Sequence, residues 1–169
     1  MMILALVAAG AILSGAPATA TTLSPDGLGR VKIGMTARQA ERALGAKLNL
    51  TADEDPSGVC LRGSRADGVD PGIIYMALKG TIRRIDVELA MEPSVVTTEG
   101  IGRGATPGAV RSTYGARAKH DDSDGAGGDD QVVDSSGRHR GVKFAFEDGK
   151  LTWMMAGEYP ALSFSEGCV

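Results

Sequence analysis

Acidic residues crowd one Gly-rich stretch of the chain, and His120 and His139 flank it. The acidic residues in question are Asp121, Asp122, Asp124, Asp129, Asp130 and Asp134. Flexible, oxygen-rich loops can bind calcium, but the EF-hand register fails because Gly125 follows directly on Asp124 and no Glu stands at the last position. A solvated acidic loop is the favoured interpretation, and calcium binding by residues 121–134 stays open. The two histidines lack a fixed third ligand, so no metal site is predicted.

Nucleophilic catalysis has little support in the residue pattern. Ser135, Ser136 and His139 lie together, yet the chain has no Gly-x-Ser-x-Gly elbow. Residues 100–104 superficially resemble a phosphate loop but lack its Lys-Ser/Thr pair. The carboxylates available for paired acid–base chemistry are Glu147, Asp148 and Glu166. Asp148 is already explained as part of a hairpin turn. We therefore predict no catalytic residue, no cofactor and no enzymatic activity.

The two cysteines, Cys60 and Cys168, are predicted to form a disulfide. Neither has the Cys-x-x-Cys spacing of a redox or zinc site, and an even count leaves no spare thiol. Closing a loop of about 100 residues contributes up to about 4.7 kcal/mol in the chain-entropy model. The bond would place a last strand, carrying Leu162 and Phe164, beside the strand of Cys60. The two halves of the chain would then share one sheet or adjoining sheets.

The composition is that of a soluble globular protein, and the first residues predict export. Of 169 residues, 43% are hydrophobic and 23% charged, and the net charge of −3 argues against a nucleic-acid partner. The first 20 residues carry no charge and end in the small-x-small pair Ala18 and Ala20. We interpret residues 1–20 as a signal peptide, with the mature chain starting at Thr21 in the periplasm or outside the cell. An uncleaved anchor helix is the alternative.

An internal repeat appears when the chain is compared with itself at a shift of 70 residues. Three positions recur: Gly34, Thr36 and Gly45 return as Gly104, Thr106 and Gly115. The two threonines are typical helix N-caps, Gln39 completes a capping box, and Pro107 suits a first helical position. The glycines at 45 and 115 are predicted to end each helix in a left-handed conformation. Each helix is about eight residues long and needs a larger element to pack against.

Strands with a period of two follow each helix. Residues 72–78 and 81–91 flank Lys79-Gly80, while residues 141–147 and 150–156 flank the hairpin signal Asp148-Gly149. The predicted fold class is α+β, with two tandem repeats in which a short capped helix packs on an antiparallel β-meander. The repeats span residues 21–94 and 95–169 and form one cooperative domain.

The first helix motif carries a family resemblance. The segment 31–40, closed by Gly45, resembles the Gly-Met-Thr-x-x-Gln-Val signature of the β-lactamase-inhibitor-protein family and of the related small-protein-A, or outer-membrane-lipoprotein, domains. The second copy has Ala105 and Ala109 in place of Met and Gln. The resemblance implies a helix-loop-helix on a four-stranded antiparallel sheet, repeated in tandem in the inhibitors. The inhibitor family pairs its cysteines within a repeat, unlike Cys60 and Cys168, and no Cys stands near residue 21 for lipidation. The layout also resembles uncharacterised exported bacterial proteins.

Alternation along the strands predicts one polar sheet face. The side chains assigned to that face or near it are Arg84, Asp86, Glu88, Lys143, Glu147, Tyr75, Trp153 and Tyr159. A mixed-charge field with a few aromatic residues is typical of a protein-binding face, although a solvated face without a partner fits equally well. Strict alternation with Leu151 and Met155 would place Trp153 in the core instead.

These observations predict an exported, non-catalytic protein-binding module. The family resemblance points to inhibition of a secreted or periplasmic enzyme as its activity. The alternative is a structural or assembly factor of the cell envelope. We expect a protein partner outside the cytoplasm, no nucleic acid, and no integral membrane segment after signal cleavage.

Overall fold

The computed structural model describes residues 21–52, 58–121, 130–135, 139–164 and 167–168. The predicted signal peptide, most of the Asp-rich loop, Ser136 and Glu166 lie outside these residues. Among the described residues, no helix is long and apolar enough to cross a membrane.

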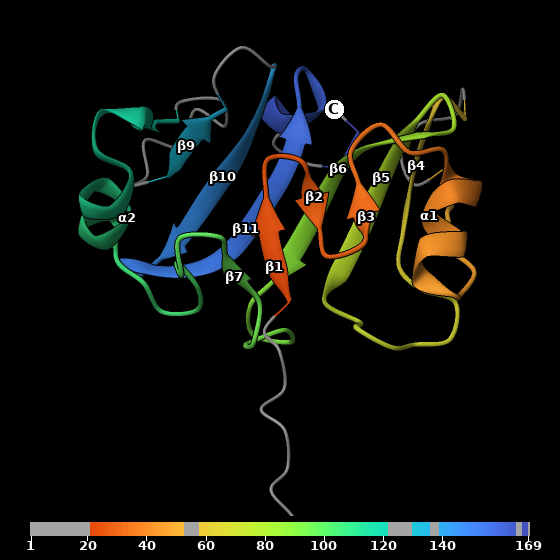
Figure 1. Ribbon diagram of the computed structural model, residues 1–169, viewed down its shortest axis with the longest axis horizontal. Coiled ribbons are helices and arrows are strands. Elements are labelled where there is room, and N and C mark those ends of the chain that lie inside the picture. The colour runs from red at the N-terminus through yellow and green to blue at the C-terminus, as the bar shows by residue number, and fades with distance from the viewer. Residues whose placement is uncertain (1–20, 53–57, 122–129, 136–138, 165–166, 169) are drawn as a thin grey trace, which may run out of the picture.

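A seven-stranded antiparallel sheet forms the frame of the molecule (Figure 1). Its strands, in spatial order, are β4 (Cys60–Gly63), β5 (Ile73–Leu78), β6 (Thr81–Glu88), β11 (Lys150–Glu158), β10 (Arg140–Glu147), β9 (Gln131–Asp134) and β8 (Ala118–His120). Strand β6 of the first half pairs with β11 of the second, from Arg84 opposite Gly157 to Glu88 opposite Trp153. Strands from both halves therefore share one sheet, as the cysteine argument predicted.

Two tight hairpins set the registers of this sheet. Lys79 and Gly80 join β5 to β6, and Asp148 and Gly149 join β10 to β11. All four residues have positive φ, from 49° to 74°, as a two-residue turn between twisted strands requires. Both predicted hairpins are confirmed.

A smaller sheet lies across one face of the large sheet, which we call the front face (Figure 1). Its strand order is β3 (Val31–Lys32), β2 (Gly27–Leu28), β1 (Thr22–Ser24) and β7 (Val96–Thr97). Leu23, Leu28 and Val31 from these strands join Ile85 and Phe144 of the large sheet in the main core, and all five are at most 4% exposed. Apolar burial between the two sheets is thus the main attraction that holds the fold.

Two short helices stand near opposite ends of the molecule (Figure 1). Helix α1 (Ala37–Leu44) has Thr36 as N-cap, a complete capping box with Gln39, and left-handed Gly45 at its end. Helix α2 (Pro107–Tyr114) has Thr106 as N-cap and Pro107 in its first turn. The predicted boundaries and N-caps are confirmed. Gly115 departs from the prediction because its φ of 58° comes with a ψ of −136°, and a 3-10 turn, η1 (Gly115–Arg117), follows.

The predicted fold class is wrong. The molecule is mostly β, with sheets of four and seven strands, and is not two helix-on-meander repeats. The described part of each half carries one α-helix and no helix-loop-helix. The physical reason lies in residues 22–32 and 96–97, whose two- and three-residue strands are too short for a period-two signal. These strands, rather than helices, cover the centre of the front face.

The chain's last turns also differ from expectation. In place of a strand through Leu162 and Phe164 there is a 3-10 helix, η2 (Ala161–Ser163), after Pro160. At the outer edge of β4, isolated bridges join Leu48 to Arg65 and Thr51 to Arg62, so residues 48–51 run alongside that edge. The opposite edge strand, β8, has three residues.

Candidate binding face

The strand registers place most of the predicted site residues on one face of the large sheet. This back face is opposite the small sheet. One row across it contains Met76, Arg84 and Gly157, and the next contains Ile74, Asp86, Met155, Lys143 and Val132. A third row contains Glu88, Trp153 and Ala145. One part of these rows is covered by the C-terminal segment, and the other part is accessible to solvent.

The C-terminal segment covers the first part. The Arg84 guanidinium donates to both carboxylate oxygens of Asp86, at 2.7 and 3.1 Å, and to the carbonyl oxygens of Ala161 and Phe164, at 2.9 Å each. It also lies 3.4 Å from the carbonyl oxygen of Gly167. Arg84 and Asp86 are 2% and 3% exposed, so this pair fastens the chain end and is not available to a partner. The prediction that both lie on an open surface is wrong.

A disulfide closes the same region. Cys60 and Cys168 are bonded, with their Cα atoms 6.0 Å apart and 108 positions apart in sequence. Cys60 packs with Met76 and Ala161 in a second, smaller apolar cluster, and Phe164 lies against it. The disulfide prediction is confirmed, although the partner segment is η2 and a turn rather than a strand.

Lys143 is a second charged residue that the structure buries. Its ammonium group lies 2.7 Å from the carboxylate of Asp121, and its side chain is 5% exposed. Asp121 directly follows β8, which lies two strands away from β10. Lys143 therefore holds the edge of the sheet together, and its predicted exposure on a binding face is wrong.

The remaining part of the back face is half-exposed and largely apolar. We call it the open strip and define it as Ile74, Met155, Val132, Trp153, Ala145 and Glu88, all of intermediate exposure. None of its apolar members belongs to either buried cluster. A solvent-accessible Trp beside a Met is unusual on a free surface and is enriched at protein interfaces.

A β-bulge decides the position of Trp153. The register of β10 against β11 shifts between Ala145 and Phe146, leaving Thr152 as the extra residue on β11. Leu151 therefore points into the main core at 1% exposure, whereas Trp153 and Met155 lie on the back face. Strict alternation, which would place Leu151 and Trp153 on the same side, does not hold across a bulge.

The other predicted aromatic residues lie elsewhere. Tyr75 is 2% exposed in the front-face core, where burial raises its pKa to about 12, so its expected exposure is wrong. Tyr159 is 40% exposed beyond the end of β11, and its hydroxyl donates to Asp134 at 3.1 Å. Burial and the nearby Asp134 carboxylate raise the pKa of Tyr159 to about 12. Glu147 is exposed at the end of β10, so the predicted residues do not form one surface.

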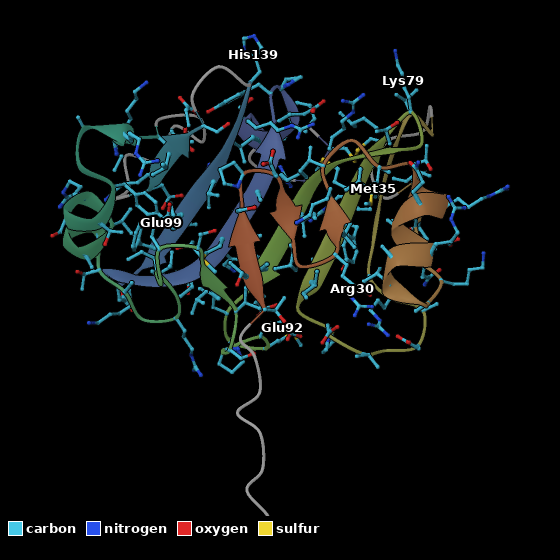
Figure 2. The ribbon with its side chains drawn as sticks, in the orientation of Figure 1. Arg30, Met35, Lys79, Glu92, Glu99 and His139 are labelled. Atoms are coloured by element: carbon cyan, nitrogen blue, oxygen red, sulfur yellow. A yellow bond between two sulfur atoms is a disulfide. The ribbon has the colours of Figure 1, made fainter. Side chains whose placement is uncertain are left out.

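The histidines and the acidic loop offer no assembled metal site in the part of the chain that the structure describes, where no three His, Cys, Asp or Glu residues converge. The His120 ring nitrogen Nδ1 lies 3.1 Å from the carbonyl oxygen of Asp130. His139 is exposed before β10, and Figure 2 shows it at the margin of the molecule. Residues 122–129 lie outside the described residues.

Comparisons with known proteins give one distant likeness in fold. No protein-family model and no curated protein matches the chain. A crystal structure described as the uncharacterized protein YfeY from Escherichia coli superposes with a TM-score of 0.53 at 16% sequence identity. The match covers 82% of this chain and all of YfeY. At that identity the likeness shows a shared fold and nothing about activity.

Proposed function

We propose that this protein is a non-catalytic binding module that acts outside the cytoplasm and engages a partner protein through the open strip. The observation that carries the proposal is the pair of half-exposed side chains Trp153 and Met155, side by side on β11 and outside both buried clusters. Trp is the residue type most enriched among interface hot spots, and Met adapts its shape to a partner. The Cys60–Cys168 disulfide supports an oxidising location.

The rim of the open strip indicates the chemistry of the partner. Glu88 lies beside Trp153 in the same row, and exposed Glu147 and Asp148 stand at the nearby hairpin end. Lys150 adds a cation at that hairpin end. A partner with an apolar centre and a basic rim would complement this surface, because rim charges guide association while the apolar centre supplies affinity.

The experiment places a photoreactive phenylalanine analogue at Met155 in the exported full-length chain. A matched control carries the analogue at Val69, an apolar residue that is 47% exposed in the loop between β4 and β5 and does not belong to the open strip. We expect a crosslinked protein from position 155 and not from position 69. An absence of crosslinks at 155, or the same product from both positions, would contradict the proposal.

Affinity and activity measurements then define the role of the captured protein. Purified partner should bind the Trp153→Ala variant at least about tenfold more weakly than the unmodified chain, which is 1.4 kcal/mol or more. Equal affinity would exclude the open strip as the interface. If the partner is an enzyme and loses activity on binding, the module is an inhibitor. Unchanged activity together with an altered assembly state of the partner indicates an envelope assembly factor.

A further inference from the structure

A small pocket lies on the other side of the molecule, between α2 with η1, the small sheet, and strands β9 and β10. Its volume is about 200 Å³. Its apolar lining comes from Leu23, Val133 and Val142, each at most 4% exposed. Three strands of two different sheets therefore meet at its floor, and the pocket is independent of the open strip.

At this pocket Tyr114 contacts two groups of opposite charge, the Glu99 carboxylate and the Arg117 guanidinium. The Tyr114 hydroxyl lies 2.9 Å from Glu99 Oε2 and 2.8 Å from Thr97 Oγ1. A carboxylate only accepts hydrogen bonds, so the single phenolic proton goes to Glu99 and the Thr97 hydroxyl donates to the Tyr114 oxygen. The Arg117 guanidinium carbon stands over the Tyr114 ring, 5.4 Å from its centroid. Burial raises the pKa of Tyr114, so at neutral pH its hydroxyl keeps the proton that orients Glu99.

The two charges line the same pocket without neutralising each other. Glu99 and Arg117 form no ion pair, and Arg117 has no carboxylate partner within the ranges that the structure describes. Asp134, the other carboxylate at the pocket, is already engaged by Tyr159 and by Lys119, whose ammonium lies 3.7 Å away. Figure 2 shows Glu99 between α2 and the strands of the large sheet, at the edge of this region. A carboxylate and a guanidinium group thus line one pocket with an apolar floor.

We propose that this pocket binds a free aliphatic α-amino acid. Arg117 would pair with the ligand's carboxylate, Glu99 with its ammonium group, and Leu23, Val133 and Val142 would surround its side chain. The volume of about 200 Å³ favours a small ligand, such as a free amino acid with an aliphatic side chain. A drug-sized ligand is too large, because such ligands need pockets of about 300 Å³ or more. A peptide terminus matches less well than a free amino acid, because it carries only one of the two charges.

The test is a titration of the mature protein with leucine, followed by calorimetry or by amide shifts in NMR spectra. Concentrations up to about 10 mM reveal a Kd near 1 mM. N-acetyl-leucine, which lacks the ammonium group, and leucinamide, which lacks the carboxylate, serve as ligand controls. We expect saturable binding of leucine and at least about tenfold weaker binding of both blocked analogues. No saturation by leucine, valine or isoleucine would overturn the proposal, as would equal binding of the blocked analogues.

Variants locate the binding site on the protein. Arg117→Gln and Glu99→Gln should each abolish leucine binding, and the glutamine at 99 keeps an oxygen for Tyr114. The matched control is Arg111→Gln, since Arg111 is exposed on α2 and does not line the pocket. Unchanged melting temperatures would show that each variant is folded. Binding that survives at Arg117→Gln and Glu99→Gln, or that is lost equally at Arg111→Gln, would contradict the assignment. A partner that still crosslinks to position 155 in these variants would show that the two sites are independent.

Discussion

The two parts of the back face differ in the burial and the charge of their side chains. Under the C-terminal segment, Arg84 and Asp86 are buried and satisfied by each other and by main-chain carbonyl groups. On the open strip, Trp153 and Met155 of the neighbouring strand β11 remain half-exposed. A buried ion pair therefore marks the covered part, and mainly apolar side chains mark the accessible part. The difference teaches that a charged row on a strand indicates a wet surface only if no distant segment returns to cover it.

The largest expected effect separates Asp86 from Glu88, two residues apart on β6. Asp86→Ala leaves the Arg84 guanidinium buried without its carboxylate, so the free energy of unfolding should fall by about 3–5 kcal/mol. Glu88→Ala, at the edge of the open strip, should change it by less than about 0.5 kcal/mol. Urea denaturation followed by circular dichroism measures both. Equal losses from the two variants would remove the distinction between the covered and open parts.

Removal of the disulfide should have the next largest effect. The double variant Cys60→Ala with Cys168→Ala frees a loop of 108 positions and should lower the free energy of unfolding by about 2–4 kcal/mol. Reducing agent provides the control, because it should destabilise the unmodified chain and leave the double variant unchanged. A denaturation midpoint of the unmodified chain that does not respond to reductant would refute this expectation.

Two methionines, one in each part of the back face, test the difference between the covered part and the open strip through packing alone. Met76 is 0% exposed in the smaller cluster beneath η2, so Met76→Ala should cost about 2 kcal/mol in unfolding free energy, at the low end for a buried methionine because η2 can settle into the space. Met155→Ala on the open strip should cost less than about 1 kcal/mol. The same urea titrations measure both, and a larger loss at Met155 would mean that the open strip belongs to the core.

The front face gives a smaller, pH-dependent effect. Tyr75 ionises near 10.0 in the unfolded chain, and burial raises its pKa to about 12 in the fold. Between these values the folded chain keeps a proton that the unfolded chain has lost, so the free energy of unfolding falls as the pH rises above 10. At pH 11 the contribution of Tyr75 is about 1 kcal/mol. Tyr75→Phe should flatten the alkaline decline by that amount, and parallel curves for the two proteins would contradict the assignment.

Local features of this fold could be predicted from the sequence because they depend on neighbouring residues. Thr36 with Gln39, Thr106 with Pro107, and the turn at Asp148-Gly149 each encode their geometry within a few positions. The disulfide followed from counting two cysteines. The small sheet could not be predicted, since its strands have only two or three residues and exist through pairing across the chain.

The candidate site was harder to predict for a related reason. The residues whose carbonyl oxygens face Arg84 are Ala161, Phe164 and Gly167, and the residue that pairs with Lys143 is Asp121, which follows β8. Neither contact leaves a local trace in the sequence. Met155 was missed because strict alternation grouped it with Leu151, and the bulge at Thr152 that separates them carries no Gly or Pro signal. A half-exposed Trp on a bulged strand is the pattern that would have drawn attention to the strip.

The ends of the large sheet bear on how the protein avoids aggregation. Open β-sheets present unpaired backbone groups at their margins, which can recruit strands from other molecules into fibrous assemblies. Here the β4 margin is screened by the bridged residues 48–51, and the β8 margin is three residues long and carries Lys119 at its centre. A short margin with a central cation is a poor template for added strands. The sheet can therefore expose an apolar strip on its face while remaining protected against polymerisation along its edges.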